Sequence, residues 1–175
     1  MGDRTWCTLN LEGILSAEHL DELVGTLVGA DAQGSESELR RCLLEGTPSF
    51  DFEEVNYAQL DDDLADLLKK LHLSYAWSWD AGGEYGAGVT LYDARRAEEI
   101  DLDKAGNDIC LTLRAIDQEG HLEKVRVWDR FYRDKWRFQV YTSNHDLLSA
   151  KADGKLPDGY FELIQRANQS EESPQ

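Results

Sequence analysis

An aromatic hairpin at residues 74–92 constrains the fold of this chain more than any other stretch. Residues 74–80 alternate three aromatic side chains, Tyr75, Trp77 and Trp79, with small ones, and residues 89–92 form a second short run typical of a strand. The glycine-rich segment between them can reverse the chain, so we expect two antiparallel strands. Alternation places the three aromatic residues on one face. They join the core if helices cover that face, and form an exposed patch for a partner if helices cover the other.

Further strands are predicted from alternating side chains at residues 5–11, 49–57, 109–116, 122–128 and 136–141. Helical spacing and capping residues predict helices after Ser16, at 38–45, at 61–72, after Ser143 and from Tyr160 onward. In the last strand, Trp136, Phe138 and Val140 are expected to pack against Leu111, Leu113 and the leucines of the helix at 61–72.

This order of elements predicts an α+β fold. We expect a single domain over residues 1–167, with a mostly antiparallel sheet of five to seven strands and helices packed on one face. The polar residues 168–175 are expected to form a disordered tail.

The charge of the chain is strongly negative. The sequence has 35 Asp and Glu against 18 Lys and Arg, a formal net charge of −17. Residues 43–68 contain acids and no base; the acids are Glu45, Asp51, Glu53, Glu54, Asp61, Asp62, Asp63 and Asp66. Such a field repels nucleic acid and anionic membranes and attracts cationic surfaces. The same charge would also be explained by solubility alone.

The three cysteines, Cys7, Cys42 and Cys110, are far apart and form no CxxC pair, which argues against a disulfide scaffold or a structural zinc site. No run of about 18 apolar residues occurs, and the N-terminus has no apolar leader segment. We expect a cytoplasmic protein that does not bind membranes.

Signatures of catalysis or of cofactor binding are not found. The four histidines are scattered, and the glycine-rich loop joins two antiparallel strands rather than preceding a helix that could hold phosphate. Residues 101–112 imitate an EF-hand loop but have Ala105 and Thr112 where oxygen ligands are needed. We therefore expect no metal, no cofactor and no enzymatic activity. A catalytic carboxylate pair cannot be located among so many acids.

The leading functional hypothesis is a non-enzymatic acidic inhibitor. Its carboxylates would occupy the basic surface with which a protein partner binds nucleic acid, as in DNA-mimicking anti-CRISPR and antirestriction proteins or nuclease immunity proteins. The protein itself would not bind nucleic acid. The predicted binding residues are Asp51, Glu53, Glu54, Asp61, Asp62, Asp63, Asp66, Glu84 and Tyr85.

Two alternatives belong to other classes. The chain could be an adaptor that binds a protein through the aromatic hairpin between Trp77 and Tyr92, with its charge serving solubility. It could also be a small enzyme whose site the sequence does not locate. Binding through acids weakens steeply with salt, whereas binding through aromatic residues does not.

Overall fold

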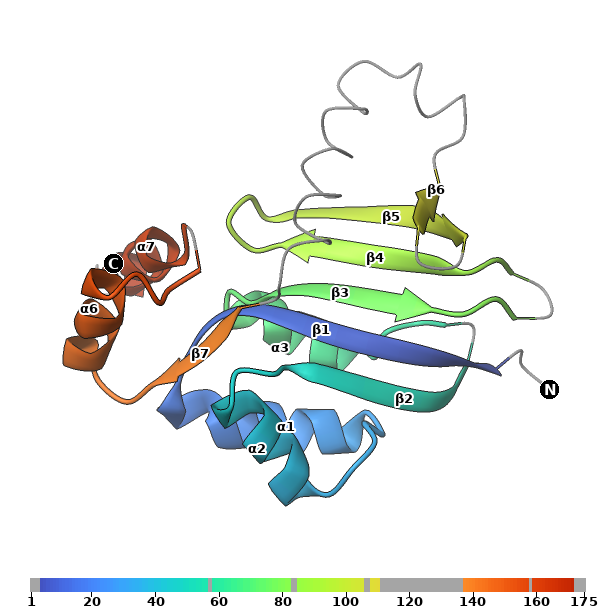
Figure 1. Cartoon of the computed structure of the whole chain (residues 1–175), viewed down its shortest axis with the longest axis horizontal. Coiled ribbons are helices and arrows are strands. Elements are labelled where there is room, and N and C mark those ends of the chain that lie inside the picture. The colour runs from blue at the N-terminus through green and yellow to red at the C-terminus, as the bar shows by residue number, and fades with distance from the viewer. Residues whose placement is uncertain are drawn as a thin grey trace, which may run out of the picture.

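A twisted sheet forms the centre of the chain. The computed structural model describes residues 4–56, 58–82, 85–105, 108–110, 137–157 and 159–171. The strands are β1 (Arg4–Ser16), β2 (Ser49–Asn56), β3 (Ser74–Trp79), β4 (Gly88–Asp93), β5 (Glu98–Ala105), β6 (Asp108–Cys110) and β7 (Phe138–Tyr141). They lie in the order β2-β1-β3-β4-β5-β6 with antiparallel neighbours, and β7 runs parallel to the end of β1 (Figure 1).

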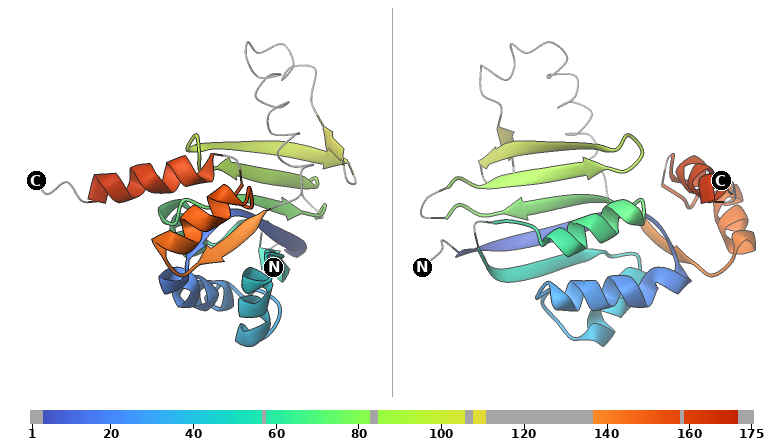
Figure 2. Two further views of the ribbon diagram at one scale, coloured as in Figure 1. Left: turned by 60° about the vertical axis from the view of Figure 1, so that its left-hand side comes forward. Right: turned by 180° about the vertical axis from the view of Figure 1, so that it is seen from behind.

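Helices cover one face of this sheet and one end of it. The helices are α1 (Leu20–Gly29), which follows a 3-10 turn at Ala17–His19, α2 (Glu36–Leu44), α3 (Asp62–Lys70), α6 (Asn144–Ala152) and α7 (Tyr160–Glu171). Seen from behind in Figure 2, α3 lies over the half of the sheet formed by β1, β2 and β3, α1 runs along the β2 side, and α6 and α7 lie at the end of the sheet. The predicted α+β fold is confirmed. No helix within the described ranges is both long and apolar enough to cross a membrane.

Helix starts follow the capping residues in the sequence. At α2 the backbone N–H of Ser35 donates to the carboxylate of Glu38 at 2.8 Å, which completes a capping box. At α3 the carboxylate of Asp61 accepts from the backbone N–H of Leu64 at 3.0 Å. At the other end of the chain, α7 continues to Glu171, so the boundary predicted at residue 168 lies within a helix. Residues 172–175 lie outside the described ranges.

The predicted aromatic hairpin is present and its aromatic face belongs to the core. β3 and β4 pair in antiparallel register, with Trp79 opposite Gly88. Tyr75 and Trp77 are each 2% exposed, and the Trp77 ring meets Phe52 edge-on at a centroid distance of 5.1 Å. Trp79 is half-buried. The structure therefore confirms that these rings face the helices and does not show the exposed aromatic patch.

One strand was not predicted. β5 pairs with β4 from Glu98 to Asp103, and its second half lies in the stretch that resembled a metal-binding loop. Its apolar residues alternate with acids, so that Leu102 is buried while Asp101 and Asp103 are exposed. The predicted contacts of Leu111, Leu113 and Trp136 lie outside the described residues. Phe138 is buried and Val140 is half-buried in β7, which pairs with β1.

Candidate functional site

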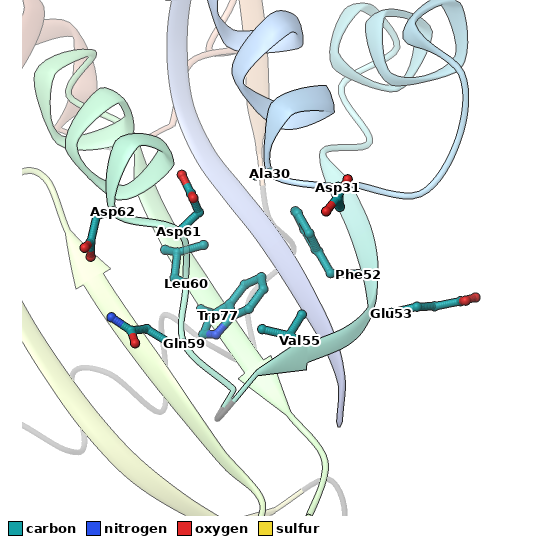
Figure 3. Close-up of a pocket in the computed structure, with 10 residues that line it drawn as sticks. All are labelled: Ala30, Asp31, Phe52, Glu53, Val55, Gln59, Leu60, Asp61, Asp62 and Trp77. Atoms are coloured by element: carbon teal, nitrogen blue, oxygen red, sulfur yellow. The ribbon is translucent and has the colours of Figure 1, made fainter. Parts of the chain in front are cut away.

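A pocket of about 400 Å³ opens where the start of α3 passes over the sheet. Its floor is apolar and consists of Phe52, Val55, Leu60 and Trp77. Carboxylates surround this floor; they belong to Asp31, Glu53, Asp61 and Asp62 (Figure 3). In that view Glu53 points away from the floor, whereas Asp31 and Asp61 stand at its upper rim. The floor itself is small, because Phe52 and Trp77 are each 2% exposed and only Val55 and Leu60 are half-buried, and it is bordered by negative charge.

The loop that leads into α3 is held in place by the core. Ala58 adopts a positive φ of 54°, and its carbonyl oxygen accepts a hydrogen bond from Trp77 Nε1 at 2.7 Å. This buried bond fixes the loop against β3, and three residues later Asp61 caps the helix. Asp61 therefore has two roles: one oxygen accepts from the helix N-terminus, and its carboxylate contributes charge to the pocket.

A β-bulge in β2 explains why Val55 forms part of the pocket wall that faces the start of α3. Between the paired positions Thr5–Val55 and Cys7–Phe52, β1 has one residue and β2 has two. The extra residue reverses the alternation of side chains along β2. As a result Val55 lies on the same side as Phe52 and lines the pocket, although regular alternation would place it on the other face.

Asp31 is brought to the rim by the turn after α1. It adopts a positive φ of 64°, and its backbone N–H donates to the carbonyl of Val28 at 3.1 Å. The next residue, Ala32, bridges to Phe52, and Gln33 N–H donates to the carbonyl of Asp51 at 2.8 Å. These backbone bonds attach the turn to the outer edge of β2 and hold Asp31 beside the pocket.

A second hollow, of about 540 Å³, continues from the first across β3, β4 and β5. The two hollows share Gln59, Leu60, Asp62 and Trp77, and we refer to them together as the acidic groove. The second hollow adds Ala58, Ala65, Lys69, Tyr75, Trp79, Thr90, Glu99 and Asp101. No described helix crosses β4 or β5 on this face, so this part of the groove is open (Figure 2).

Sheet register brings the residues of the second hollow together. Tyr75, Tyr92 and Glu99 stand side by side on adjacent strands, and Thr90 stands beside Asp101. The Tyr75 hydroxyl donates to Glu99 Oε2 at 2.8 Å, and the Thr90 hydroxyl donates to Asp101 Oδ1 at 2.6 Å. Burial, and then the hydrogen bond to Glu99, raise the pKa of Tyr75 well above its ordinary value. Tyr75 therefore remains a hydrogen-bond donor at neutral pH.

Negative charge dominates the groove. Its lining includes six carboxylates, from Asp31, Glu53, Asp61, Asp62, Glu99 and Asp101. Of the described residues that line it, Lys69 alone carries a positive charge. A concave surface with one sign of charge attracts counter-ions of the opposite sign. The arrangement suits a cationic partner.

The structure divides the predicted binding residues. Glu53, Asp61 and Asp62 line the groove, while Asp63 and Asp66 are exposed on α3 and do not. Tyr85 is half-buried in the β3–β4 connection and does not line it either. Glu84 and the side chain of Glu54 lie outside the described residues.

Asp51 does not belong with the groove residues. Phe52, its neighbour on β2, faces the helices, so Asp51 faces the other side of the sheet. There it accepts a hydrogen bond from the Thr8 hydroxyl at 2.9 Å. Of these two predicted binding residues, Glu53 stands at the bulge and lines the groove, whereas Asp51 does not.

Three groove carboxylates were not predicted: Asp31, Glu99 and Asp101. Glu99 and Asp101 share strand parity in β5, and alternation with Ile100 and Leu102 was the available signal. Asp31 had no such signal, because its place depends on the contact between a loop and β2. Across the part of the chain that the structure describes, no group of three or more His, Cys, Asp or Glu residues could hold a metal ion.

Comparison with known proteins gives no relative to argue from. No family model matches the sequence, and comparison with curated proteins and with solved structures gave no significant match.

Proposed function

We propose that the protein is a non-enzymatic acidic inhibitor whose groove binds the basic, nucleic-acid-binding surface of a protein partner in the cytoplasm. The observation that carries the proposal is the convergence of six carboxylates from four separate regions of the chain along one groove. Three unpaired cysteines are consistent with a reducing compartment.

The physical basis is the exchange of counter-ions. Lys and Arg side chains that bind a nucleic-acid backbone displace ions from it, and they gain the same stabilisation from a dense array of carboxylates. The half-buried Val55 and Leu60 add a small apolar contact area for the aliphatic stems of these long side chains. Anti-CRISPR proteins, antirestriction proteins and nuclease immunity proteins are the classes for which such a surface would serve.

The adaptor alternative receives less support. It requires the aromatic residues of the hairpin to contact a partner, yet Tyr75 and Trp77 are almost fully buried and Trp79 is half-buried. The acidic wall of the groove is, by contrast, mostly exposed: Glu53, Asp61, Asp62, Glu99 and Asp101 are all accessible.

The test is a competition experiment. A partner captured by the tagged protein from its native host is purified and bound to fluorescent duplex DNA. The wild-type protein should displace the DNA, and its apparent affinity should fall steeply between low and physiological ionic strength. The triple variant Glu53→Lys, Asp62→Lys, Asp101→Lys should fail to displace it.

A matched control separates site from net charge. The variant Glu45→Lys, Asp51→Lys, Asp153→Lys has the same change in charge, but its exposed positions lie outside the groove. It should compete nearly as well as wild type. If both triple variants lose equally the ability to displace the DNA, the overall negative charge of the protein, and not the groove, is responsible for binding. If neither does, the groove is not the contact.

A further inference from the structure

Lys69 occupies an unusual place for a base in this protein. It comes from the last turn of α3 and lies in the second hollow of the acidic groove. Its ammonium is 3.1 Å from Glu99 Oε2 and 5.5 Å from the centre of the Tyr92 ring. The next residue, Lys70, extends elsewhere and pairs with Glu22 of α1 at 3.0 Å.

The groups around the Lys69 ammonium form an ordered cation site. The same Glu99 oxygen accepts the Tyr75 hydroxyl at 2.8 Å, which orients the carboxylate. Tyr75 and Tyr92 stack with ring centroids 5.3 Å apart, so the aromatic surface beside the carboxylate is itself supported. A carboxylate held next to an aromatic face is a favourable site for a cation, and for a guanidinium above all.

We infer that Lys69 fills this site as an internal substitute, and that an arginine side chain of the partner displaces it on binding. The inference rests on the proposed function and names the chemistry of the contact: a guanidinium on Glu99 and Tyr92. Both partners of the existing ion pair are about two-fifths exposed, at 40% for Lys69 and 43% for Glu99. Ion pairs this exposed contribute little to stability, so the exchange costs little.

Arginine is the better occupant for a geometric reason. Its guanidinium is planar, can stack on the Tyr92 ring while donating to Glu99, and is more weakly hydrated than an ammonium. Lys69 would then lower the affinity of the groove for weakly basic segments, because any incoming cation must first separate it from Glu99. A partner with a well-placed arginine would be selected over one with charge alone.

The experiment compares two variants with the same change in net charge. A fluorescently labelled hexa-arginine peptide is titrated at low salt into wild type, Lys69→Met and Lys70→Met, with hexa-citrulline as the uncharged control peptide. Lys69→Met should bind hexa-arginine roughly three- to five-fold more tightly than Lys70→Met, as expected for removal of a competing exposed charge. Adding Glu99→Gln to Lys69→Met should abolish that gain. Thermal melts confirm that each variant is folded.

The outcomes separate this inference from the proposed function. If Lys69→Met and Lys70→Met bind equally, the displacement of Lys69 is overturned. If, in addition, reversal of Glu53, Asp62 and Asp101 abolishes binding of the peptide, the groove remains the basic-partner site. If that reversal leaves the affinity unchanged, the proposed function fails as well. A gain for Lys69→Met that persists with Glu99→Gln would also overturn the inferred site.

Discussion

Two groups of carboxylates lie on opposite faces of the same sheet and have opposite surroundings. In the acidic groove all six carboxylates are exposed, and the one lysine that lines the groove, Lys69, pairs with Glu99. On the other face, Glu12 and Asp93 are 7% and 2% exposed and lie with arginines. Asp93 accepts from Arg95 Nε at 2.8 Å and from an Arg96 guanidinium nitrogen at 3.1 Å, and Arg95 is 3.7 Å from Glu12.

This second group, which we call the arginine cluster (Glu12, Ser74, Asp93, Arg95 and Tyr160), attaches α7 to the sheet. The Tyr160 hydroxyl donates to Ser74 Oγ, which also accepts from Ala94 N–H at 2.9 Å. The Arg95 guanidinium lies 5.3 Å from the centre of the Tyr160 ring. Gly13 permits this close packing, since a Cβ there would be 2.9 Å from Tyr160 Cε1.

The comparison shows how one residue type can serve two purposes. A buried carboxylate must be paired, because an unpaired charge in the interior destabilises the fold. In the arginine cluster, Arg95 provides that pairing. Burial alone would lower the pKa of Arg95, but the hydrogen bond and charge of Asp93 raise it. Exposed carboxylates need no ion-pair partner within the protein for folding. Those of the groove are therefore available to bind a cationic group from another molecule.

The largest expected effect is on stability, in the arginine cluster. Asp93→Ala should lower the free energy of unfolding by about 3 kcal/mol or more, because Arg95, only 25% exposed, loses its closest carboxylate. Asp101→Ala, the matched change in the groove, should cost less than about 1 kcal/mol, because it removes an exposed hydrogen bond. Urea unfolding measures both. Equal losses would remove the distinction between the two groups.

A smaller effect is expected from Tyr160 in alkaline solution. Burial, and then the charge of Glu12, raise the pKa of Tyr160 above its ordinary value. The resulting stability is fully present below the unfolded pKa of about 10 and is lost as the pH rises above it. At a pH one unit above 10, wild type should have lost about 1.4 kcal/mol from this residue that Tyr160→Phe does not lose. Urea midpoints at neutral and alkaline pH give the difference, and parallel pH curves would contradict it.

Within the groove, Asp61 should differ from its neighbour. Asp61→Ala should destabilise the protein by about 1 kcal/mol, since the backbone N–H of Leu64 loses its capping oxygen. Asp62→Ala should change stability by no more than about 0.5 kcal/mol, because Asp62 is exposed and interacts mainly with the helix dipole. Thermal melts of the two variants measure the difference in stability. A larger destabilisation by Asp62→Ala than by Asp61→Ala would contradict this prediction.

Per position, the smallest effect should come from reversing groove charges. Glu53→Lys, Asp62→Lys, Asp101→Lys should change the free energy of unfolding by no more than about 0.5 kcal/mol per position, and less at high salt. Relief of repulsion among like charges offsets the loss of favourable charge at the start of α3. A cooperative loss of several kcal/mol would show that these carboxylates are structural, as those of the arginine cluster are.

Local patterns in the sequence predicted several elements well. The helix predicted at 61–72 begins at the N-cap residue of α3, whereas α2 begins at Glu36, two residues before the predicted start. Alternation around Trp77 predicted the hairpin and left open whether its aromatic face would be buried. These features depend on side chains close together in the chain. β5 was missed because its apolar positions are few and its acids resembled metal ligands, so two competing patterns fell on the same residues.

The sequence by itself determined that this protein would be acidic and α+β, where several helices would begin, and that residues 74–92 would form a hairpin. Charge, helical spacing and strand alternation are local properties of the chain. Only the tertiary structure decided which acids meet. Strand order placed Glu99 and Asp101 on the same face as Tyr75 and Trp77, with one strand between them, and one extra residue in β2 changed the alternation after Phe52. Alternation gives the parity of a strand but neither its neighbours nor its bulges, since these depend on contacts between distant segments.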